Sequence, residues 1–373
     1  MEYKALKDIA KITMGQSPDS SSYNEEKDGL PFFQGNADFG ELYPNERVWC
    51  NEPKKVAESG DILISVRAPI GALNYAKDKC CIGRGLAAIT IEDEAERNYV
   101  FHLLKARNND LNQKGTGSTF KAIGKNVLEE LAVPQINRGE QQKCMDMMDL
   151  LESIIRERKS QLDKLDELIK ARFVELFGDP RINPFGYDIK ELGKTCKVIT
   201  GNTPSRKVPE YYGSYLEWIK TDNIVAGLLN PTEATESLSE SGAEVGRYVD
   251  ENAILMACIA GSIASIGRVC VTDRRVAFNQ QINAIVSNQY NTLFLYTMLQ
   301  ISKDYLVEDI NMALKGILSK SKLEKKIFIV PPLELQNQFA DFVKQVDKSK
   351  VVVQKALNEA QTLFNSLMQE YFE

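Results

Sequence analysis

The sequence offers few of the residues from which catalytic and metal sites are built. Its 373 residues include one histidine, His102, and seven cysteines that form no CxxC pair. Histidine and spaced cysteines supply most metal centres and most nucleophile–base pairs, so these classes of site are disfavoured. His102 falls in the helical pattern FHLLKAR, where a core or surface role is expected. We expect the cysteines to be reduced thiols of a cytoplasmic protein.

Long apolar runs are also missing. No run approaches the ~20 residues that a membrane helix needs, which argues against a membrane partner. The first residues, MEYKALKDIA, have neither the apolar core nor the cleavage site of a secretory signal. A cytoplasmic location is therefore predicted.

Motifs that hold nucleotides or cofactors fail at defining positions. Asp188 stands where a phosphate-binding loop ending Gly193-Lys194-Thr195 would need glycine. Gly115-Thr116-Gly117 has Phe120 at the third glycine of a dinucleotide-binding loop. Asn183-Pro184-Phe185-Gly186 lacks the second proline of a base-methylating motif, and a turn is its simpler interpretation. We therefore predict a non-catalytic chain with no metal and no cofactor of its own.

A basic excess, the usual mark of a nucleic-acid-binding protein, is absent. The 46 basic and 52 acidic residues give a net charge of −6. Residues 1–134 hold 17 basic and 20 acidic groups, and residues 181–331 hold 17 and 16. If the chain binds DNA, partner subunits must neutralise much of the phosphate charge, and the isolated chain should bind weakly and salt-sensitively.

The chain contains an internal duplication. Residues 12–18, ITMGQSP, match 198–204, VITGNTP, at an offset of 186. Three further matches follow in the same order at offsets of 196 or 197: PIG with SIG, LAAI with INAI, and VP with VP. The drift in offset is what loop insertions in the second copy produce. We predict four segments: a head at 1–136, a long helix at 137–178, a second head at 179–331 and a second long helix at 332–373.

Each head mixes strand-like runs with short helical patterns and lacks regular alternation, which predicts an α+β fold. The two tails carry apolar residues at steps of three and four, with Arg158 and Lys350 as polar interruptions. At ~1.5 Å per residue each tail helix would be roughly 57–59 Å long. We expect the two helices to pack as an antiparallel coiled coil with the heads at opposite ends. The alternative is that each stripe packs on its own head. The predicted seam comprises Leu151, Ile155, Leu162, Leu165, Ile169, Phe173, Leu176, Phe339, Val343, Val346, Val353, Leu357, Phe364 and Leu367.

Taken together, these segments resemble the specificity (S) subunit of type I restriction–modification enzymes. The resemblance rests on GQSPDSSSYN at 15–24, GDILISVRAPIG at 60–71, CIGRGLAAI at 81–89, ARFVELFGDPRINP at 171–184 and ITGNTPS at 199–205. It implies that each head is a target recognition domain for one half of a split double-stranded DNA sequence, and that the helices set the gap. It also implies two methyltransferase subunits and restriction subunits as partners, which hold S-adenosylmethionine, ATP and Mg.

Side chains that read bases are Arg or Lys for guanine and Asn or Gln for adenine. Residues able to contact DNA in loops of the first head are Gln16, Ser20, Ser21, Tyr23, Gln34, Asn36, Arg67, Arg84, Lys114 and Lys121. Those of the second head are Arg206, Lys207, Tyr211, Lys220, Asn223, Arg268, Arg274, Gln280 and Gln281. The segment VRAPIG around Arg67 has the longer counterpart CIAGSIASIG, which has no arginine. This difference argues against a structural duty shared by the two heads and is compatible with heads that read different sequences.

Two other functions remain open at this point. A two-headed coiled-coil adaptor for protein partners suits the acidic charge, whereas the Gln, Asn, Arg and Lys residues of the head loops favour DNA. An enzyme fused to its own recognition domains would need the cofactor motifs that fail above. Neither the half-site bases nor the spacer length follows from the sequence.

Overall fold

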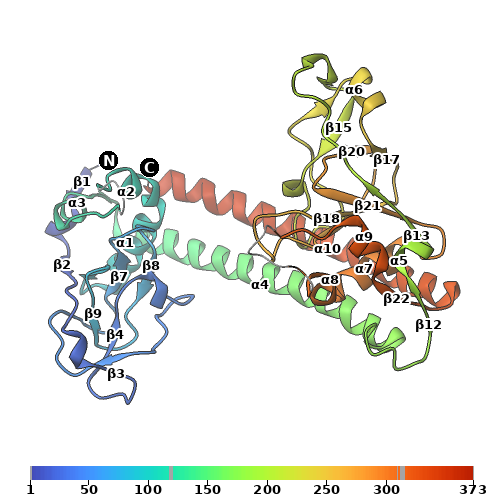
Figure 1. Cartoon of the computed structure of the whole chain (residues 1–373). Helices are drawn as coiled ribbons and strands as arrows, with labels where there is room; N and C mark the ends of the chain where they lie inside the picture. Colours follow the sequence, from blue (N-terminus) through green and yellow to red (C-terminus); the bar gives the residue numbers. More distant parts are fainter. Residues whose placement is uncertain (1, 117–120, 309, 311–315, 373) are drawn as a thin grey trace. The chain divides into compact units, whose positions relative to one another are not determined.

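The structure, a computed structural model, describes residues 2–116, 121–308, 310 and 316–372 (Figure 1). The chain forms two compact units: unit 1 comprises residues 1–158 and 356–373, and unit 2 comprises residues 159–355. Each unit contains one α+β head together with part of each of two long helices, α4 (Arg138–Phe177) and α10 (Leu333–Phe372). None of the helices formed by the described residues combines the length and hydropathy that membrane crossing requires.

Head 1 is built on two small sheets and a strand pair. The antiparallel four-stranded sheet has the order β2 (Lys11–Met14), β10 (Leu86–Thr90), β7 (Ile62–Ser65), β8 (Leu73–Tyr75). The five-stranded sheet has the order β3 (Tyr23–Asn24), β5 (Trp49–Cys50), β4 (Leu30–Phe33), β9 (Cys80–Ile82), β6 (Val56–Ala57). Strand β1 (Glu2–Ala5) pairs with β11 (Ala132–Gln135). Helices are α1 (Glu94–Ala106), α2 (Asn108–Gln113) and α3 (Lys125–Glu129), with 3-10 turns η1 (Leu6–Asp8), η2 (Ser20–Ser22) and η3 (Asn36–Asp38).

Head 2 repeats this topology strand by strand. Its four-stranded sheet has the order β13 (Cys196–Thr200), β21 (Ile282–Ser287), β18 (Ile254–Ala257), β19 (Val269–Val271). Its five-stranded sheet has the order β14 (Tyr212–Gly213), β16 (Ser237–Leu238), β15 (Leu216–Ile219), β20 (Val276–Phe278), β17 (Tyr248–Val249). Strand β12 (Asp188–Glu191) pairs with β22 (Ile327–Val330). The pairs β4–β9 and β15–β20 are both parallel, so the duplication extends to strand direction.

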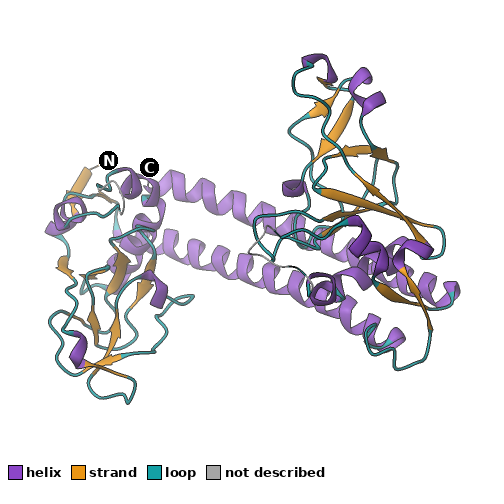
Figure 2. Ribbon diagram, viewed as in Figure 1, coloured by secondary structure: helices purple, strands orange, loops and turns teal. Residues whose placement is uncertain are grey.

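The helices of head 2 pack against both of its sheets (Figure 2). They are α5 (Leu192–Thr195), α6 (Glu240–Val245), α7 (Thr292–Ile301), α8 (Lys303–Val307) and α9 (Lys320–Lys325), with 3-10 turns η4 (Pro209–Tyr211) and η5 (Thr221–Asn223). The central strands β7 (ILIS) and β18 (ILMA) are buried along their whole length. A short, uninterrupted apolar run is the sequence pattern of such a strand.

Helix α4 has a clear start and end. The side-chain Oδ1 of Asn137 accepts a hydrogen bond from the Glu140 backbone N–H at 3.0 Å, which caps the first turn. At the other end Gly178 has a positive φ of 71° and its N–H donates to the Val174 carbonyl at 2.8 Å. This left-handed C-cap favours glycine because it has no Cβ to clash.

The two long helices pack on each other and on the heads. In unit 1, Leu151 and Ile155 of α4 share a buried cluster with Ala360 and Phe364 of α10. In unit 2, Phe173 of α4 lies 5.5 Å, centroid to centroid, from Phe339 of α10. The early part of α4 thus meets the late part of α10, and the reverse, so the helices run antiparallel.

The head residues belong to the same clusters. Phe173 also stacks on Phe294 of α7 at 5.4 Å, and Cys144 and Met148 of α4 are buried with the core of head 1. The predicted fold class, two α+β heads and two antiparallel long helices, is confirmed. The stripes also pack on the heads, so the two packing arrangements considered as alternatives occur together.

The residues predicted to form the seam are buried or half-buried. The buried ones are Leu151, Ile155, Ile169, Phe173, Phe339, Val343, Val346, Phe364 and Leu367. The half-buried ones are Leu162, Leu165, Leu176, Val353 and Leu357. Lys350 pairs with Asp166 across the two helices, Nζ to Oδ1, at 2.8 Å. Phe177 and Phe372, near the ends of the helices, are fully buried but were not among the predicted seam residues.

Candidate nucleic-acid interface

In head 1 the loops that follow β2, β4, β7 and β9 are joined at one edge of the two sheets by backbone hydrogen bonds. The Gln16 N–H donates to the Ile82 carbonyl at 3.0 Å, and the Gly85 N–H donates to the Gln34 carbonyl at 3.1 Å. The Val66 N–H donates to the Gly85 carbonyl at 2.9 Å. We call this region, defined by Gln16, Gln34, Arg67, Arg84 and Lys121, the head 1 loop edge.

Glycines allow these loops to approach closely. A Cβ on Gly15 would lie 2.1 Å from the Gly83 carbonyl oxygen, and one on Gly85 would lie 2.4 Å from the Gln34 carbonyl oxygen. Neither position can carry a side chain without moving backbone. The segment Gly83-Arg84-Gly85 therefore presents Arg84 between two close backbone contacts.

The side chains at the head 1 loop edge are exposed. Among the described residues, none of these five side chains has a hydrogen-bond or ion-pair partner. Backbone contacts fix their positions instead: the Arg84 N–H donates to the Ser17 hydroxyl at 3.2 Å, and the Ala68 N–H donates to the Lys121 carbonyl at 3.0 Å. An edge of this kind offers two guanidinium groups, two amides and an ammonium group to a partner.

The other head 1 residues predicted to contact DNA lie elsewhere or make internal bonds. Ser20 and the exposed Ser21 lie on η2, where the Ser21 hydroxyl donates to Asp19 at 3.1 Å. Tyr23 donates to the Pro18 carbonyl at 3.0 Å and stacks on Phe32. Asn36 begins η3, close in sequence to Gln34, and Lys114 is exposed at the end of α2.

Head 2 has an equivalent edge, formed by several corresponding backbone bonds. The Asn202 N–H donates to the Phe278 carbonyl at 3.1 Å, as Gln16 does to Ile82. The Asn279 N–H donates to the Ile219 carbonyl at 3.0 Å, as Gly83 does to Phe33. The bridge between Ile259 and Ile317 corresponds to the bridge between Arg67 and Ala122. The matched positions are Gln16 with Asn202, Gln34 with Lys220, Arg67 with Ile259 and Arg84 with Gln280.

The polar side chains at these head 2 positions are engaged within the head. Asn202 donates to the Val245 carbonyl at 2.9 Å and accepts from the Arg247 N–H at 2.7 Å. The Gln280 Oε1 accepts from the Thr203 hydroxyl. Ile259 has no polar side-chain atom at all. Asn202 and Thr203 were not predicted as site residues, although the repeat aligns Asn202 with Gln16.

Arg206 and Lys220 converge on one carboxylate. Arg206 donates to both oxygens of Glu236 at 3.1 and 2.9 Å, and the Lys220 Nζ lies 2.5 Å from Glu236. The Arg206 guanidinium also lies 4.2 Å from the centre of the Tyr212 ring. Hydrogen bonds from Arg206 and Lys220 lower the pKa of Glu236 to about 2, so this carboxylate stays ionised.

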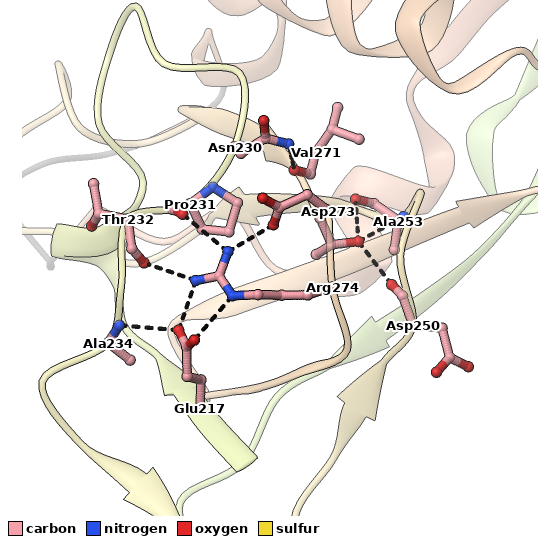
Figure 3. A network of polar contacts seen from close by, with 11 residues as sticks. Glu217, Asn230, Pro231, Thr232, Ala234, Asp250, Ala253, Val271, Asp273 and Arg274 are labelled. Carbon is pink, nitrogen blue, oxygen red and sulfur yellow. Dashed lines mark hydrogen bonds and ion pairs between the residues drawn. The ribbon is translucent and has the colours of Figure 1, made fainter.

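Arg274 occupies the centre of a polar network (Figure 3). Its Nε and Nη2 donate to Glu217 at 3.0 and 2.7 Å, and its Nη1 donates to Asp273 at 2.7 Å. The Nη1 and Nη2 atoms also approach the Pro231 and Thr232 carbonyls at 3.4 Å. The side chain of Arg274 is 31% exposed. These contacts hold the segment 230–234 against β15, so the guanidinium serves the structure of head 2.

The remaining head 2 candidates are dispersed. Asn223 is buried and donates to the Thr232 hydroxyl and the Glu233 carbonyl, so its amide supports the same segment. Lys207 is exposed, Tyr211 is half-buried on η4, and Gln281 accepts from Asn279 at 3.1 Å. Arg268 lines a cavity of about 280 Å³ with Asp166, Asp347 and Lys350.

The groups that often mark catalysis take part in packing. His102 is 4% exposed, with Nε2 3.6 Å from Asp149. All seven cysteines are buried free thiols, and burial raises the pKa of Cys80 and Cys81 to about 12. The part of the chain that the structure describes contains no group of three His, Cys, Asp or Glu side chains placed to hold a metal ion.

Comparison with known proteins identifies the family. Residues 1–165 and 184–361 match the model of the type I restriction modification DNA specificity domain. The chain belongs to this family. The two matched stretches follow the two copies seen in the sequence and in the sheets, and the predicted resemblance to specificity subunits is confirmed.

Named members of the specificity-subunit family are found among its relatives. The chain is 46% identical over 163 residues to a putative type I restriction enzyme MjaX specificity subunit of Methanocaldococcus jannaschii, covering 43% of this chain and 38% of that protein. It is 22% identical over 399 residues to the MjaIX specificity subunit of the same organism, covering 96% of this chain and 91% of that protein.

Solved structures of specificity subunits share the fold. The S subunit of a type I restriction–modification system from M. genitalium superposes with a TM-score of 0.62 at 14% identity, covering 100% of this chain and 96% of that one. A chain from a structure on complex assembly of the type I R-M system gives a TM-score of 0.56 at 17% identity, covering 100% of this chain and 97% of that one. At these identities the comparison establishes the fold that this chain shares with solved specificity subunits.

Proposed function

We propose that this chain is the DNA-sequence-specificity subunit of a type I restriction–modification complex, working in the cytoplasm. Head 1 and head 2 each read one half of a split double-stranded target. Two methyltransferase subunits and the restriction subunits assemble on the chain and carry out the chemistry, using S-adenosylmethionine, ATP and Mg that they hold themselves. The chain itself is non-catalytic.

One observation carries this proposal. The two heads have the same strand order and the same loop edge, yet the side chains at matched edge positions differ in chemical type. A duplicated scaffold with unlike side chains at its edges is suited to reading two unlike sequences. The adaptor hypothesis predicts no such concentration of unpaired Arg, Gln and Lys side chains at one edge.

The charge of the chain supports a dependence on partners. The net charge is −6, and three of the basic candidates, Arg206, Lys220 and Arg274, are paired with carboxylates of their own head. Binding that depends on phosphate contacts needs free cations. The methyltransferase subunits are therefore expected to supply much of the charge that holds the duplex.

The test is methylome sequencing. The chain is expressed with the methyltransferase encoded beside it in a host that lacks this methylation. The expected result is a split motif, methylated on adenine, that disappears when the gene for this chain is deleted. A complex that forms without any sequence-specific methylation would instead support the adaptor. A gel-shift titration in which the lone chain binds the split target as tightly as the complex would contradict the charge argument.

A further inference from the structure

The head 1 loop edge has a property that its head 2 counterpart lacks, and it bears on which bases are read. We infer that Arg67 and Arg84 are the guanine-reading residues of head 1, and that head 2 reads its half-site without an arginine at these positions. This inference rests on the proposed function and deepens it, because it assigns a chemical preference to one half-site and names the residues responsible.

The first step is geometric. Arg84 is held on both sides: the Gly83 N–H donates to the Phe33 carbonyl at 2.8 Å and the Gly85 N–H donates to the Gln34 carbonyl at 3.1 Å. Its own N–H donates to the Ser17 hydroxyl at 3.2 Å. Because its backbone is fixed in this way, contact with a partner requires ordering of the Arg84 side chain but not of the loop that carries it.

Arg67 is positioned by the same network. The flanking Val66 N–H donates to the Gly85 carbonyl at 2.9 Å, which ties the Arg67 loop to the Arg84 loop. On the other side the Ile123 N–H donates to the Val66 carbonyl at 2.9 Å, and Arg67 forms a β-bridge with Ala122. The two arginines therefore belong to one rigid surface, although they are separated in sequence.

The second step is chemical. A guanidinium that is exposed and has no carboxylate partner keeps its paired N–H donors available. A bidentate contact from arginine to O6 and N7 of guanine is the commonest specific contact in the major groove. By contrast, Arg47 of the same head is paired with Asp38 at 2.9 Å, and Arg138 is paired with Asp93 at 2.7 Å. Among the described arginines of head 1, Arg67 and Arg84 thus combine a fixed backbone with a free guanidinium.

The third step is the comparison within the chain. The fold places Ile259 where head 1 has Arg67, and Gln280 where head 1 has Arg84. Gln280 already accepts a hydrogen bond from Thr203. Head 2 thus shows that the same scaffold accepts isoleucine at the position of Arg67 and glutamine at the position of Arg84. The exchanges Arg67→Ile and Arg84→Gln copy head 2 into head 1.

Phosphate contact is the competing role for these arginines. A phosphate contact weakens binding to all sequences alike when it is removed, whereas a base contact changes which sequences are accepted. Arg84→Lys separates the two roles, because lysine keeps the positive charge and loses the planar pair of donors. Arg138→Gln, which removes a positive charge from the first turn of α4, is the matched control for charge alone.

The experiment uses the full chain in its complex with the methyltransferase subunits. The complexes methylate a library in which both half-sites are randomised, and methylated products are sequenced. We expect the wild-type chain to select at least two G·C pairs in one half-site. In Arg84→Gln, preference at one such pair should fall about tenfold to a hundredfold, with the other half-site unchanged. Arg84→Lys should keep part of this preference, because lysine can still donate to guanine but lacks the planar pair of donors. Arg67→Ile should act on a different position of the same half-site, and Arg138→Gln should change no base preference.

Distinct outcomes overturn the inference and the proposed function. A uniform loss of methylation in the arginine variants with the motif intact would assign Arg67 and Arg84 to phosphate and overturn the inference. Arginine variants with an unchanged motif and an unchanged rate of methylation would also overturn the inference, because neither arginine would then contact DNA. A wild-type complex that selects no split sequence would overturn the proposed function itself. The intact second half-site reports in each variant that the chain has folded and assembled.

Discussion

Two adjacent arginines of head 2 show how the same side chain serves different purposes. Arg274 makes a bidentate contact with Glu217, and both side chains are about 30% exposed. Arg275 pairs with Asp250 at 2.5 Å, but these side chains are 59% and 64% exposed. The hydrogen bonds from Arg274 also lower the pKa of Glu217, which shows that the pair favours the ionised carboxylate.

We predict that Arg274→Ala destabilises head 2, because it leaves Glu217 half-buried without its main donor. Loss of hydrogen bonds to a charged group of this kind costs about 1–3 kcal/mol. Arg275→Ala removes the same charge at the neighbouring residue and should leave stability nearly unchanged, because its ion pair is exposed. Urea titration of both variants measures the free energy of unfolding.

The pH dependence gives an independent check on Arg274. Since the folded-state pKa of Glu217 is lowered, the stability it contributes is present above its unfolded-state pKa and is lost as pH falls through the folded-state value. The difference between wild type and Arg274→Ala should therefore shrink on acidification. If Arg274→Ala left the stability unchanged and reduced the affinity for DNA, Arg274 would be a DNA contact and not a structural residue.

At the scale of single residues, the sequence shows which side chains are able to contact DNA, but it does not show which of them are bound within the head. Arg84 and Arg274 are both arginines beside glycine-, asparagine- or aspartate-containing loops, and both were predicted to contact DNA. Only the fold brings Glu217 to Arg274 across 57 residues of sequence. The partner of a charged side chain is set by long-range packing, which neither local pattern nor spacing contains.

The long helices are the elements that the sequence predicts best. Their apolar stripes, the Asn137 cap and the Gly178 terminus are local signals, and the structure has a cap hydrogen bond and a positive φ at those residues. What periodicity could not give is the partner of each stripe. Cys144, Met148, Leu151 and Ile155 all lie in one buried cluster that contains residues of head 1 and residues of α10. Apolar residues at helical spacing indicate which face of a helix is buried, but they do not indicate which element of the fold covers that face.

The contact between the helices in unit 2 includes a charged group that can be tested. Lys350 of α10 pairs with Asp166 of α4, and Asp347, one turn before Lys350, faces the same cavity. Burial raises the pKa of Asp347, and the negative charge of Asp166 adds to this effect, while Lys350 opposes it. The ionised form of Asp347 is therefore disfavoured in the folded protein.

We predict that Asp347→Asn stabilises unit 2 at pH 7. Because the folded-state pKa is raised above the unfolded value, wild-type stability falls as pH rises through the interval between the two, and asparagine removes this loss. The gain should disappear at acidic pH, where the wild-type carboxyl is protonated. Thermal unfolding at several pH values measures the difference.

Lys350→Met should instead destabilise unit 2 at pH 7, since it leaves the carboxylates of Asp166 and Asp347 without the ammonium group of Lys350. A loss of stability in Asp347→Asn at neutral pH would show that the carboxylate is a needed partner of Lys350.

At the scale of the whole chain, short sequence matches reveal the duplication, and both heads have the same strand order. The offset of 186 that aligns Gly15 with Gly201 also aligns Gln16 with Asn202, and the structure gives these two residues the same backbone partner positions. The sequence could not show that Asn202 is engaged by Val245 and Arg247 while the Gln16 amide is exposed. The sequence repeat therefore predicts which positions of the two heads are equivalent. It does not predict whether the side chain at each position is exposed to a ligand or hydrogen-bonded within the head.

The last prediction concerns spacing. We propose that α4 and α10, each continuous over 40 residues and each shared by both units, determine the spacer between the two half-sites. Four residues inserted after Arg158, where unit 1 ends and unit 2 begins, add about 6 Å of helix. At about 3.4 Å per base pair, the spacer of the methylated motif should lengthen by one or two base pairs.

The half-sites themselves should not change, because the insertion leaves both loop edges intact. Methylome sequencing reads spacer and half-sites in a single experiment. The control is the same insertion after Gly186, in the turn that follows α4, where a Cβ would meet no neighbouring atom within 4 Å. It lengthens the chain without lengthening the helix and should leave the spacer as it was. A changed half-site base, or a spacer that ignores the insertion in α4, would mean that something other than the helices measures the distance.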